Sequence, residues 1–206
     1  MFIRFAFALS ALVAQPALSQ TAPPAPGLVQ VALETSAGRI VVAVDKGHAP
    51  ITAGNFLKYV DSGRLNGESF YRAMPYGDGE GLIQGGITSD VKKLYPAIAH
   101  EPTTQTGLKH VAGTLSAARG APGTARADFF ILTTDIPGFD ADSARAGDNA
   151  GYAAFGQVVE GMEVVRRIFA SPLSPTKGEG ALKGQMLDPA VRILKAARVQ
   201  FRDQQP

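Results

Sequence analysis

The stretch ESFYRAMPYGDGEGLIQGG, residues 68–86, contains one arginine, Arg72, and one glutamine, Gln84, on either side of a glycine-rich turn. Mostly apolar residues flank the glycines, and this pattern predicts two short strands, at residues 69–73 and 82–84. An arginine in such a strand has either a surface ion pair or a functional role, because a charged side chain is rarely left in an apolar core. The rest of the sequence bears on that choice.

Most of the flanking sequence predicts further strands. Residues 28–34 alternate apolar and polar side chains and residues 40–44 form a β-branched run, so the two segments are expected to pair as a hairpin. Four more strands are expected, at residues 113–118, 128–133, 152–159 and 191–201. Loops are expected at residues 87–110, where small strands would also occur, at 139–151 and at 171–188.

Two helices are expected, far apart in the sequence. Apolar residues recur at i, i+3, i+4 and i+7 after Pro50, and Gly63 ends this pattern. The first helical face comprises Ala53, Phe56, Leu57 and Val60, and the second comprises Met162, Val165, Ile168 and Phe169. Because the strands come in runs rather than alternating with helices, the predicted fold is mainly β, a closed eight-stranded antiparallel barrel capped by two α-helices.

The composition excludes several kinds of site. The chain of 206 residues has no cysteine, which rules out disulfides, thiolate nucleophiles and cysteine zinc sites. Its net charge is +2 without a block of like charges, so no nucleic-acid partner is expected. Residues 77–81 lack the spacing of a phosphate loop, and residues 139–148 lack the glycine of a calcium loop. No cofactor or metal is expected, and the histidines are interpreted as ordinary surface or hydrogen-bonding residues.

The N-terminus has the pattern of a secretory signal peptide. Arg4 precedes an apolar run at residues 5–14. Ala17 and Ser19 are the small residues expected three and one positions before the cleavage point of a signal peptide. The run is too short for a membrane span, which needs about 20 residues. The expected segments are a signal peptide at residues 1–19, a Pro-rich flexible lead at 20–27 and a barrel domain at 28–202. We therefore expect a periplasmic protein that does not insert into the membrane after the signal peptide is removed. The alternative interpretation is that the apolar run forms an N-terminal strand.

A series of short motifs runs in one order through residues 29–170. They are LETSAGRIVVAV (33–44), AP-x-T-x-x-NF-x-x-YV-x-SG (49–63), FYR (70–72), LIQGG (82–86), GTLSAAR (113–119), DFFI (128–131), FD (139–140) and AFGQVVEGMEVV (154–165). No single motif is specific, but the ordered series resembles the cyclophilin-type peptidyl-prolyl cis-trans isomerases, in a divergent, exported bacterial form. The resemblance implies an eight-stranded barrel capped by two helices, which is the architecture that the periodicity predicts.

The resemblance also implies an active site on the outer face of the barrel. Arg72 and Gln84 would be catalytic, with Phe130 as the floor of a proline pocket. The implied substrate contacts are Phe70, Leu82, Arg119, Asp128, Phe130, Phe139 and Tyr152. Twisting an X-Pro bond leaves a lone pair on the proline nitrogen, and a guanidinium donor stabilises that state more than the planar amide. The expected partners are proline-containing segments of exported or unfolded proteins, bound by a monomer.

Several positions depart from the family pattern, including Ala117, Arg119 and Gly138, and three more bear on the site. Gly81 stands where an aromatic residue usually lies against the proline ring, Tyr71 where histidine is usual, and Asp128 where glutamine is usual. We expect the Asp128 carboxylate to pair with Arg72 and to restrain it, so that Asp128→Gln raises the rate about 2–10-fold. The alternative is a solvated Asp128 that accepts a hydrogen bond from a loop amide.

Two functions compete at this stage. The first is isomerisation of X-Pro bonds during the folding of exported proteins. The second is a low-activity module or chaperone that binds proline-containing segments, which Gly81 and Asp128 favour. Single residues also have structural alternatives: Arg72 in a surface salt bridge, Gln84 as a turn residue and Phe130 as a core residue.

Overall fold

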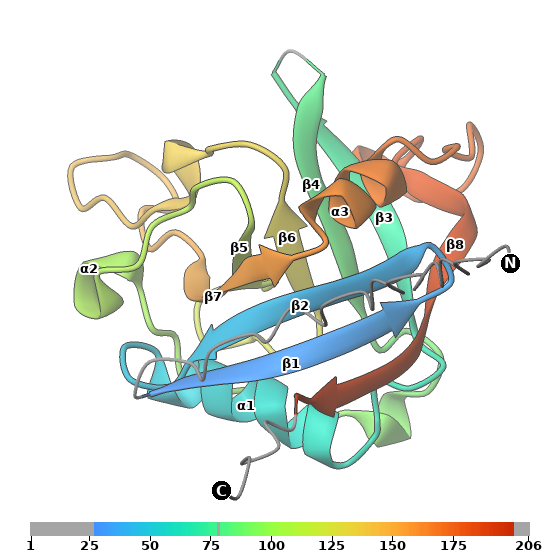
Figure 1. Ribbon diagram of the computed structural model, residues 1–206. Helices are drawn as coiled ribbons and strands as arrows, with labels where there is room; N and C mark the ends of the chain where they lie inside the picture. The colour runs from blue at the N-terminus through green and yellow to red at the C-terminus, as the bar shows by residue number, and fades with distance from the viewer. Residues whose placement is uncertain (1–26, 78, 200–206) are drawn as a thin grey trace, which may run out of the picture.

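Eight antiparallel strands close into a barrel in the computed structural model, which describes residues 27–77 and 79–199 (Figure 1). The order around the barrel is β1-β2-β7-β5-β6-β4-β3-β8. The strands are β1 (Leu28–Thr35), β2 (Gly38–Asp45), β3 (Ser69–Tyr76), β4 (Glu80–Gly86), β5 (Thr114–Ala117), β6 (Phe129–Leu132), β7 (Ala153–Glu160) and β8 (Met186–Arg198). The predicted fold class is confirmed, and closure leaves no strand of this sheet with an unpaired edge.

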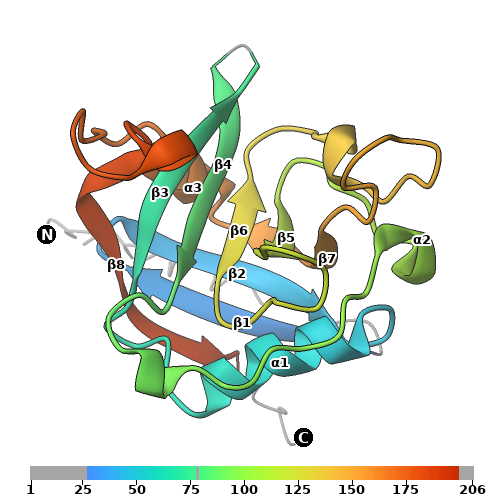
Figure 2. The same cartoon turned by 180° about the vertical axis from the view of Figure 1, so that it is seen from behind.

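Two of the three helices were predicted, and they cover different parts of the barrel (Figures 1 and 2). In α1 (Pro50–Asp61), Phe56 packs against Phe129 and Phe155, with ring centroids 5.2 and 5.3 Å away. In α3 (Met162–Phe169), the buried residues are Val164, Val165 and Ile168. The third helix, α2 (Thr103–Thr106), is a single turn that the periodicity does not reveal.

The prediction of small strands at residues 87–110 was wrong. Within the described residues this segment holds the 3₁₀ turn Val91–Lys93 and α2, and no strand. A buried carboxylate in the segment, that of Glu101, accepts hydrogen bonds from the amides of Ile51 and Thr52 at 3.0 and 2.6 Å. Because Ala49 gives α1 no side-chain cap, Glu101 satisfies the helix N-terminus from a distant part of the chain.

Other boundaries also differ from the prediction. The strand β8 begins at Met186, inside the segment 171–188 that was expected to be a loop. The hairpin of β3 and β4 extends beyond the predicted strands and projects from the barrel (Figure 1). The expected signal peptide, residues 1–19, and all but the last residue of the expected lead, 20–27, lie outside the described residues. Among the residues described, no helix has the length and apolar character needed to cross a bilayer.

Apolar residues gather on both faces of the barrel wall. Successive side chains of a strand point to opposite faces, so β6 sends Phe129 and Ile131 into the interior and Phe130 and Leu132 outward. The outer face carries a second apolar cluster, called here the outer cluster. It consists of Leu82, Phe130, Leu132 and Ile136, with Met74, Ala118, Phe139 and Tyr152 packed against it.

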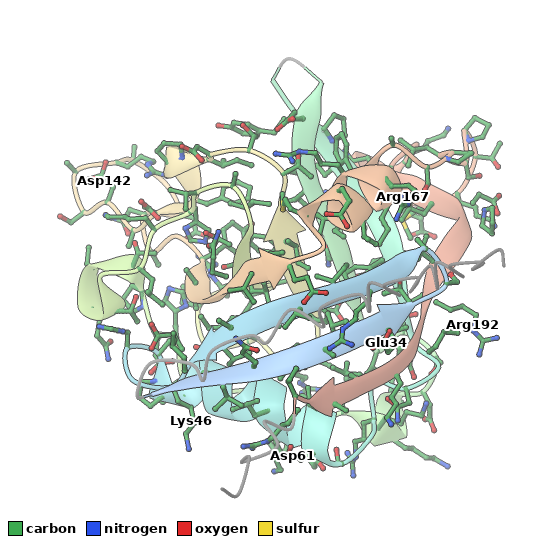
Figure 3. All side chains as sticks on the ribbon, in the orientation of Figure 1. Glu34, Lys46, Asp61, Asp142, Arg167 and Arg192 are labelled. Carbon is green, nitrogen blue, oxygen red and sulfur yellow. The ribbon has the colours of Figure 1, made fainter. Side chains whose placement is uncertain are left out.

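Charged side chains of both signs are spread over the rest of the surface. Lys46, Asp61, Asp142, Arg167 and Arg192 are all exposed and lie around the barrel (Figure 3). None of these five residues forms an ion pair or a hydrogen bond with a member of the outer cluster. The four buried members of the outer cluster expose at most 3% of their surface, so it reaches solvent through the partly buried residues packed against them.

Candidate active site

Arg72 is held against the outer face of the barrel by two glutamines. It lies opposite Gln84 in the pairing of β3 with β4, and its Nη1 donates to Gln84 Oε1 at 2.8 Å. Its Nε and Nη2 donate to Gln185 Oε1 at 2.9 and 2.6 Å. These hydrogen bonds use three of the five N–H donors of a guanidinium. Arg72 forms no salt bridge with any of the described residues, so the surface ion-pair interpretation has no support.

A β-bulge brings Tyr71 to the same face as Arg72. The register of β3 against both β4 and β8 shifts between Phe70 and Arg72, which leaves Tyr71 as an extra residue. Phe70 and Ala73 point inward and are buried, while Tyr71 and Arg72 both face outward. Bulges re-aim side chains in this way next to functional sites.

Tyr71 connects Gln84 to Asp128. Its hydroxyl accepts from Gln84 Nε2 at 2.6 Å and donates to Asp128 Oδ2 at 2.7 Å. Burial, followed by the charge of Asp128, raises the pKa of Tyr71, which therefore remains a neutral phenol. Four side chains form one continuous chain of hydrogen bonds, from Asp128 through Tyr71 and Gln84 to Arg72.

The structure does not place Asp128 against Arg72, contrary to our expectation from the sequence. The Asp128 carboxylate accepts a hydrogen bond from Tyr71, and its interaction with the Ile87 backbone lowers its pKa, so it matches the loop-amide alternative in part. Asp128 precedes β6 rather than belonging to it, and its Oδ1 occupies the space that a side chain at Gly86 would fill, 2.1 Å from an added Cβ. Burial raises the pKa of Asp128, and its hydrogen bonds oppose that shift.

Aromatic rings surround Phe130 in the outer cluster. Phe139 and Tyr152 meet it edge-on, with centroids at 5.7 and 5.3 Å, and His110 stacks on it at 6.2 Å. Phe130 keeps only 3% of its surface exposed, whereas Phe139 and Tyr152 are partly exposed. A proline ring that reaches Phe130 must therefore displace part of this rim.

His110 is buried beneath Phe130 and bonds on both sides of its ring. Its Nδ1 lies 2.7 Å from Asp140 Oδ1, and its Nε2 lies 2.9 Å from Ser116 Oγ. Burial lowers the pKa of His110 although Asp140 opposes the shift. The order Ser-His-Asp resembles that of a hydrolase triad, but Ser116 is completely buried and cannot meet a substrate. Together, Ser116, His110 and Asp140 support Phe130 from below. The spacing of these three residues in the sequence does not predict that contact.

Arg119 and Phe70, two further predicted substrate contacts, have other partners. All five N–H donors of Arg119 are engaged, two with the Asp148 carboxylate at 2.8 and 2.9 Å and the others with the carbonyl oxygens of Gly120 and Gly151. Phe70 is fully buried inside the barrel, where its ring lies 5.7 Å from that of Phe129. Phe70 is therefore not available to a ligand on the outer face, because the bulge between Phe70 and Arg72 places these two residues on opposite faces of β3.

The remaining predicted residues come together. Leu82, Phe130, Phe139 and Tyr152 all belong to the outer cluster. A cavity of about 310 Å³ opens beside Gln84 and Asp128, with Ala118 and Arg119 also in its wall. In the described part of the chain no group of three His, Asp, Glu or Cys side chains could hold a metal ion.

Sequence reasoning missed Gln185 and Tyr76. Gln185 lay within a predicted loop with no pattern to single it out. Tyr76 is 46% exposed, and its ring lies 6.0 Å from that of Phe139.

A Cβ at Gly81 would lie 2.0 Å from the carbonyl oxygen of Met74, so the close approach of β3 and β4 requires glycine there. Tyr76 supplies an aromatic side chain near the rim that Gly81 cannot supply.

Comparison with known proteins bears on the family and fold of this chain. The family described as cyclophilin type peptidyl-prolyl cis-trans isomerase/CLD matches residues 30–197. Peptidyl-prolyl cis-trans isomerase A of Dickeya dadantii is 39% identical over 141 residues, which cover 67% of this chain and 70% of the relative. Peptidyl-prolyl cis-trans isomerase of Acinetobacter baylyi is 35% identical over 146 residues, 70% of this chain and 73% of the relative.

A solved structure shares the fold at lower identity. A cyclophilin type isomerase of Cryptosporidium parvum, crystallised in the presence of the dipeptide Ala-Pro, superposes with a TM-score of 0.65 at 20% identity. The match covers 84% of this chain and 99% of that one. The family match over residues 30–197, together with the two bacterial relatives, shows that this chain belongs to the cyclophilin-type peptidyl-prolyl cis-trans isomerases.

Proposed function

We propose that this isomerase acts on X-Pro bonds in proline-containing segments of exported proteins, with Arg72 and Gln84 as its catalytic residues. The observation that carries the assignment is the position of Arg72. Its guanidinium is fixed by Gln84 and Gln185 beside the outer cluster, and two N–H donors are left for a ligand.

The proposed mechanism is electrostatic stabilisation of the twisted amide. Rotation about the X-Pro bond has a barrier of about 20 kcal/mol, because it destroys amide resonance. The proline nitrogen then carries a lone pair, and an N–H of Arg72 donates to it. A hydrogen bond from a charged donor contributes roughly 1.5–3 kcal/mol, which corresponds to about 10–100-fold in rate.

Two features support catalysis by Arg72. Burial lowers the pKa of Arg72, but arginine stays protonated in proteins, so the donor is present at every working pH. The outer cluster offers apolar and aromatic surface to the proline ring and reduces competing contact with water. A solved structure with the same fold was determined in the presence of the dipeptide Ala-Pro, which belongs to the substrate class proposed here.

The pattern at residues 1–19 supports the export part of the proposal. Arg4, the apolar run and the small residues at 17 and 19 are typical of a signal peptide. We expect mass spectrometry of the mature protein to show removal of about the first 19 residues. An intact Met1 in the exported fraction would contradict export by cleavage.

The decisive test of activity is a set of arginine variants. We expect Arg72→Ala to lower kcat/KM on an Ala-Pro peptide by about 10–100-fold without loss of the folded circular dichroism spectrum. Arg72→Lys should recover little, because a single ammonium cannot reproduce the planar fork that meets two glutamines. Arg192→Ala, which removes an exposed arginine of β8, is the matched control and should keep full activity. Full activity in Arg72→Ala would reject the assignment.

One observation favours the second candidate, a low-activity module that binds proline-containing segments. Phe130 is nearly buried under Phe139 and Tyr152, so a proline ring has limited access to it. The same assay separates the two functions. Binding of the peptide without faster isomerisation, and without dependence on Arg72, would favour the binding module.

A further inference from the structure

We propose that Tyr71 and Asp128 are positioning residues that orient the Gln84 amide toward Arg72, and that a proton on Asp128 reverses this orientation and lowers the activity of the isomerase. The proposal rests on the function proposed above, in which Arg72 is the donor to the substrate. It replaces the expectation that Asp128 restrains Arg72 by direct pairing.

The hydrogen bonds have one direction when Asp128 is ionised. A carboxylate only accepts, so the single hydrogen of the Tyr71 hydroxyl points to Asp128 Oδ2. The Tyr71 oxygen is then free to accept from Gln84 Nε2, at 2.6 Å. The other end of the Gln84 amide, Oε1, consequently faces Arg72 Nη1. Each of the three contacts in the chain then pairs a donor with an acceptor.

Protonation of Asp128 removes the reason for this direction. The protonated carboxyl can donate to Tyr71, and the Tyr71 hydrogen then points toward Gln84. Gln84 pairs with that hydrogen only by turning Oε1 toward Tyr71, which turns its NH2 group toward Arg72. Two donors then face each other, and of the two glutamines only Gln185 still accepts from Arg72.

The groups around Asp128 determine where the switch operates. Tyr71 donates to its carboxylate, nearby polar groups of Gln84 and the Ile87 backbone also lower its pKa, and Glu68, which is paired with Lys93, raises it by repulsion. Arg119 and Arg126 line the same cavity, but Arg119 is engaged by Asp148. Burial is the largest effect and raises the pKa of Asp128, so the ionised, active form exists above this raised value and is lost as the pH falls through it.

The pH profile distinguishes this role from a purely structural one. Rotation of an X-Pro bond requires no proton transfer, and Arg72 remains protonated throughout, so an isomerase without the switch has a flat profile. Two other groups with shifted pKa values lie nearby, Glu68 and His110, which is under Phe130. Both are present in the parent and in the variants of Asp128 and Tyr71, so the difference between these profiles reports Asp128.

The experiment measures kcat/KM for an Ala-Pro peptide between about pH 4 and 8 by NMR exchange, which needs no coupling protease. We expect the parent enzyme to lose activity about 3–10-fold on the acid side, a loss that corresponds to one weakened hydrogen bond to Arg72. For Tyr71→Phe and Asp128→Asn, kcat/KM should not change with pH and should stay at about the value that the parent reaches on the acid side. Glu34→Gln removes a half-exposed carboxylate on β1 and should keep the parent profile.

The Gln84 side-chain amide gives a readout that does not depend on activity. Its resonances should titrate with the acid limb in the parent and stay constant in Asp128→Asn. A flat parent profile, or an acid limb that persists in both Tyr71→Phe and Asp128→Asn, would overturn the switch and leave the proposed function intact. An unchanged rate in Arg72→Ala would reject the proposed function and the switch together.

Discussion

At the scale of single residues, two neighbouring side chains fix the orientation of Arg72. A guanidinium has five donors and several rotatable bonds, and an unsupported arginine on a barrel surface samples many orientations. Gln84 and Gln185 limit Arg72 to one plane, with three donors engaged. This preorganisation matters because a donor that is already oriented needs no rearrangement when the bond twists.

Gln185 provides a test of this positioning. We expect Gln185→Ala to lower kcat about 3–10-fold with little change in KM, because one neutral acceptor of the guanidinium, worth about 1 kcal/mol, is lost. Gln185→Asn, whose shorter side chain keeps the amide, should recover part of the rate. Steady-state kinetics on one Ala-Pro peptide measure both parameters, and Gln30→Ala on β1 is the control. A rise in KM at constant kcat would instead indicate that Gln185 binds the substrate.

At the scale of elements, the hairpin of β3 and β4 organises the site. A bulge in β3 lets Tyr71 and Arg72 both face outward, whereas strict alternation would turn one of the two into the barrel. Further along, the strands approach so closely that Gly81 must be glycine, and Tyr76 extends over the rim of the outer cluster. The hairpin therefore supplies both the arginine network and an exposed aromatic ring.

The exposed ring of Tyr76 leads to a prediction about peptide binding. It lies four residues from Arg72 on the same face of β3, roughly 13 Å along the strand, so it reaches residues beside the proline rather than the proline itself. We expect Tyr76→Ala to raise KM for a tetrapeptide about 2–10-fold at nearly constant kcat, since an aromatic contact contributes about 0.5–1.5 kcal/mol. Tyr76→Phe should resemble the parent. Equal KM values for all three proteins would exclude a contact between Tyr76 and the peptide.

At the scale of the whole molecule, local patterns predict the barrel but not the network inside the site. Strand and helix periodicity depends on neighbouring residues, so β1, β2, α1 and α3 are visible in the sequence. The bond between Arg72 and Gln185 joins residues 113 positions apart, and no local pattern encodes it. The resemblance to a family identifies Arg72 and Gln84, but Phe70 is buried inside the barrel and Asp128 has a different partner.

Buried titratable groups also couple the stability of the fold to pH, and His110 gives the clearest prediction. Burial lowers its pKa in the folded protein, whereas in the unfolded chain it protonates near its ordinary value of about 6.5. The unfolded state therefore binds more protons below about pH 6.5, and the free energy of unfolding falls as the pH decreases from there through the lowered folded pKa. Asp128 acts with the opposite sign, because its folded pKa is raised, so the comparison must isolate His110.

A variant that cannot titrate isolates this effect. His110→Asn should be less stable than the parent at pH 7, because one or both of the bonds to Asp140 and Ser116 are lost. Its stability should nevertheless fall less than that of the parent between pH 7 and 5, since contributions from the other histidines and from Asp128 are common to both proteins and cancel. Urea unfolding followed by circular dichroism at each pH gives the two slopes. Parallel slopes would mean that His110 is protonated equally easily in the folded and unfolded states, and that its burial under Phe130 does not hold it neutral.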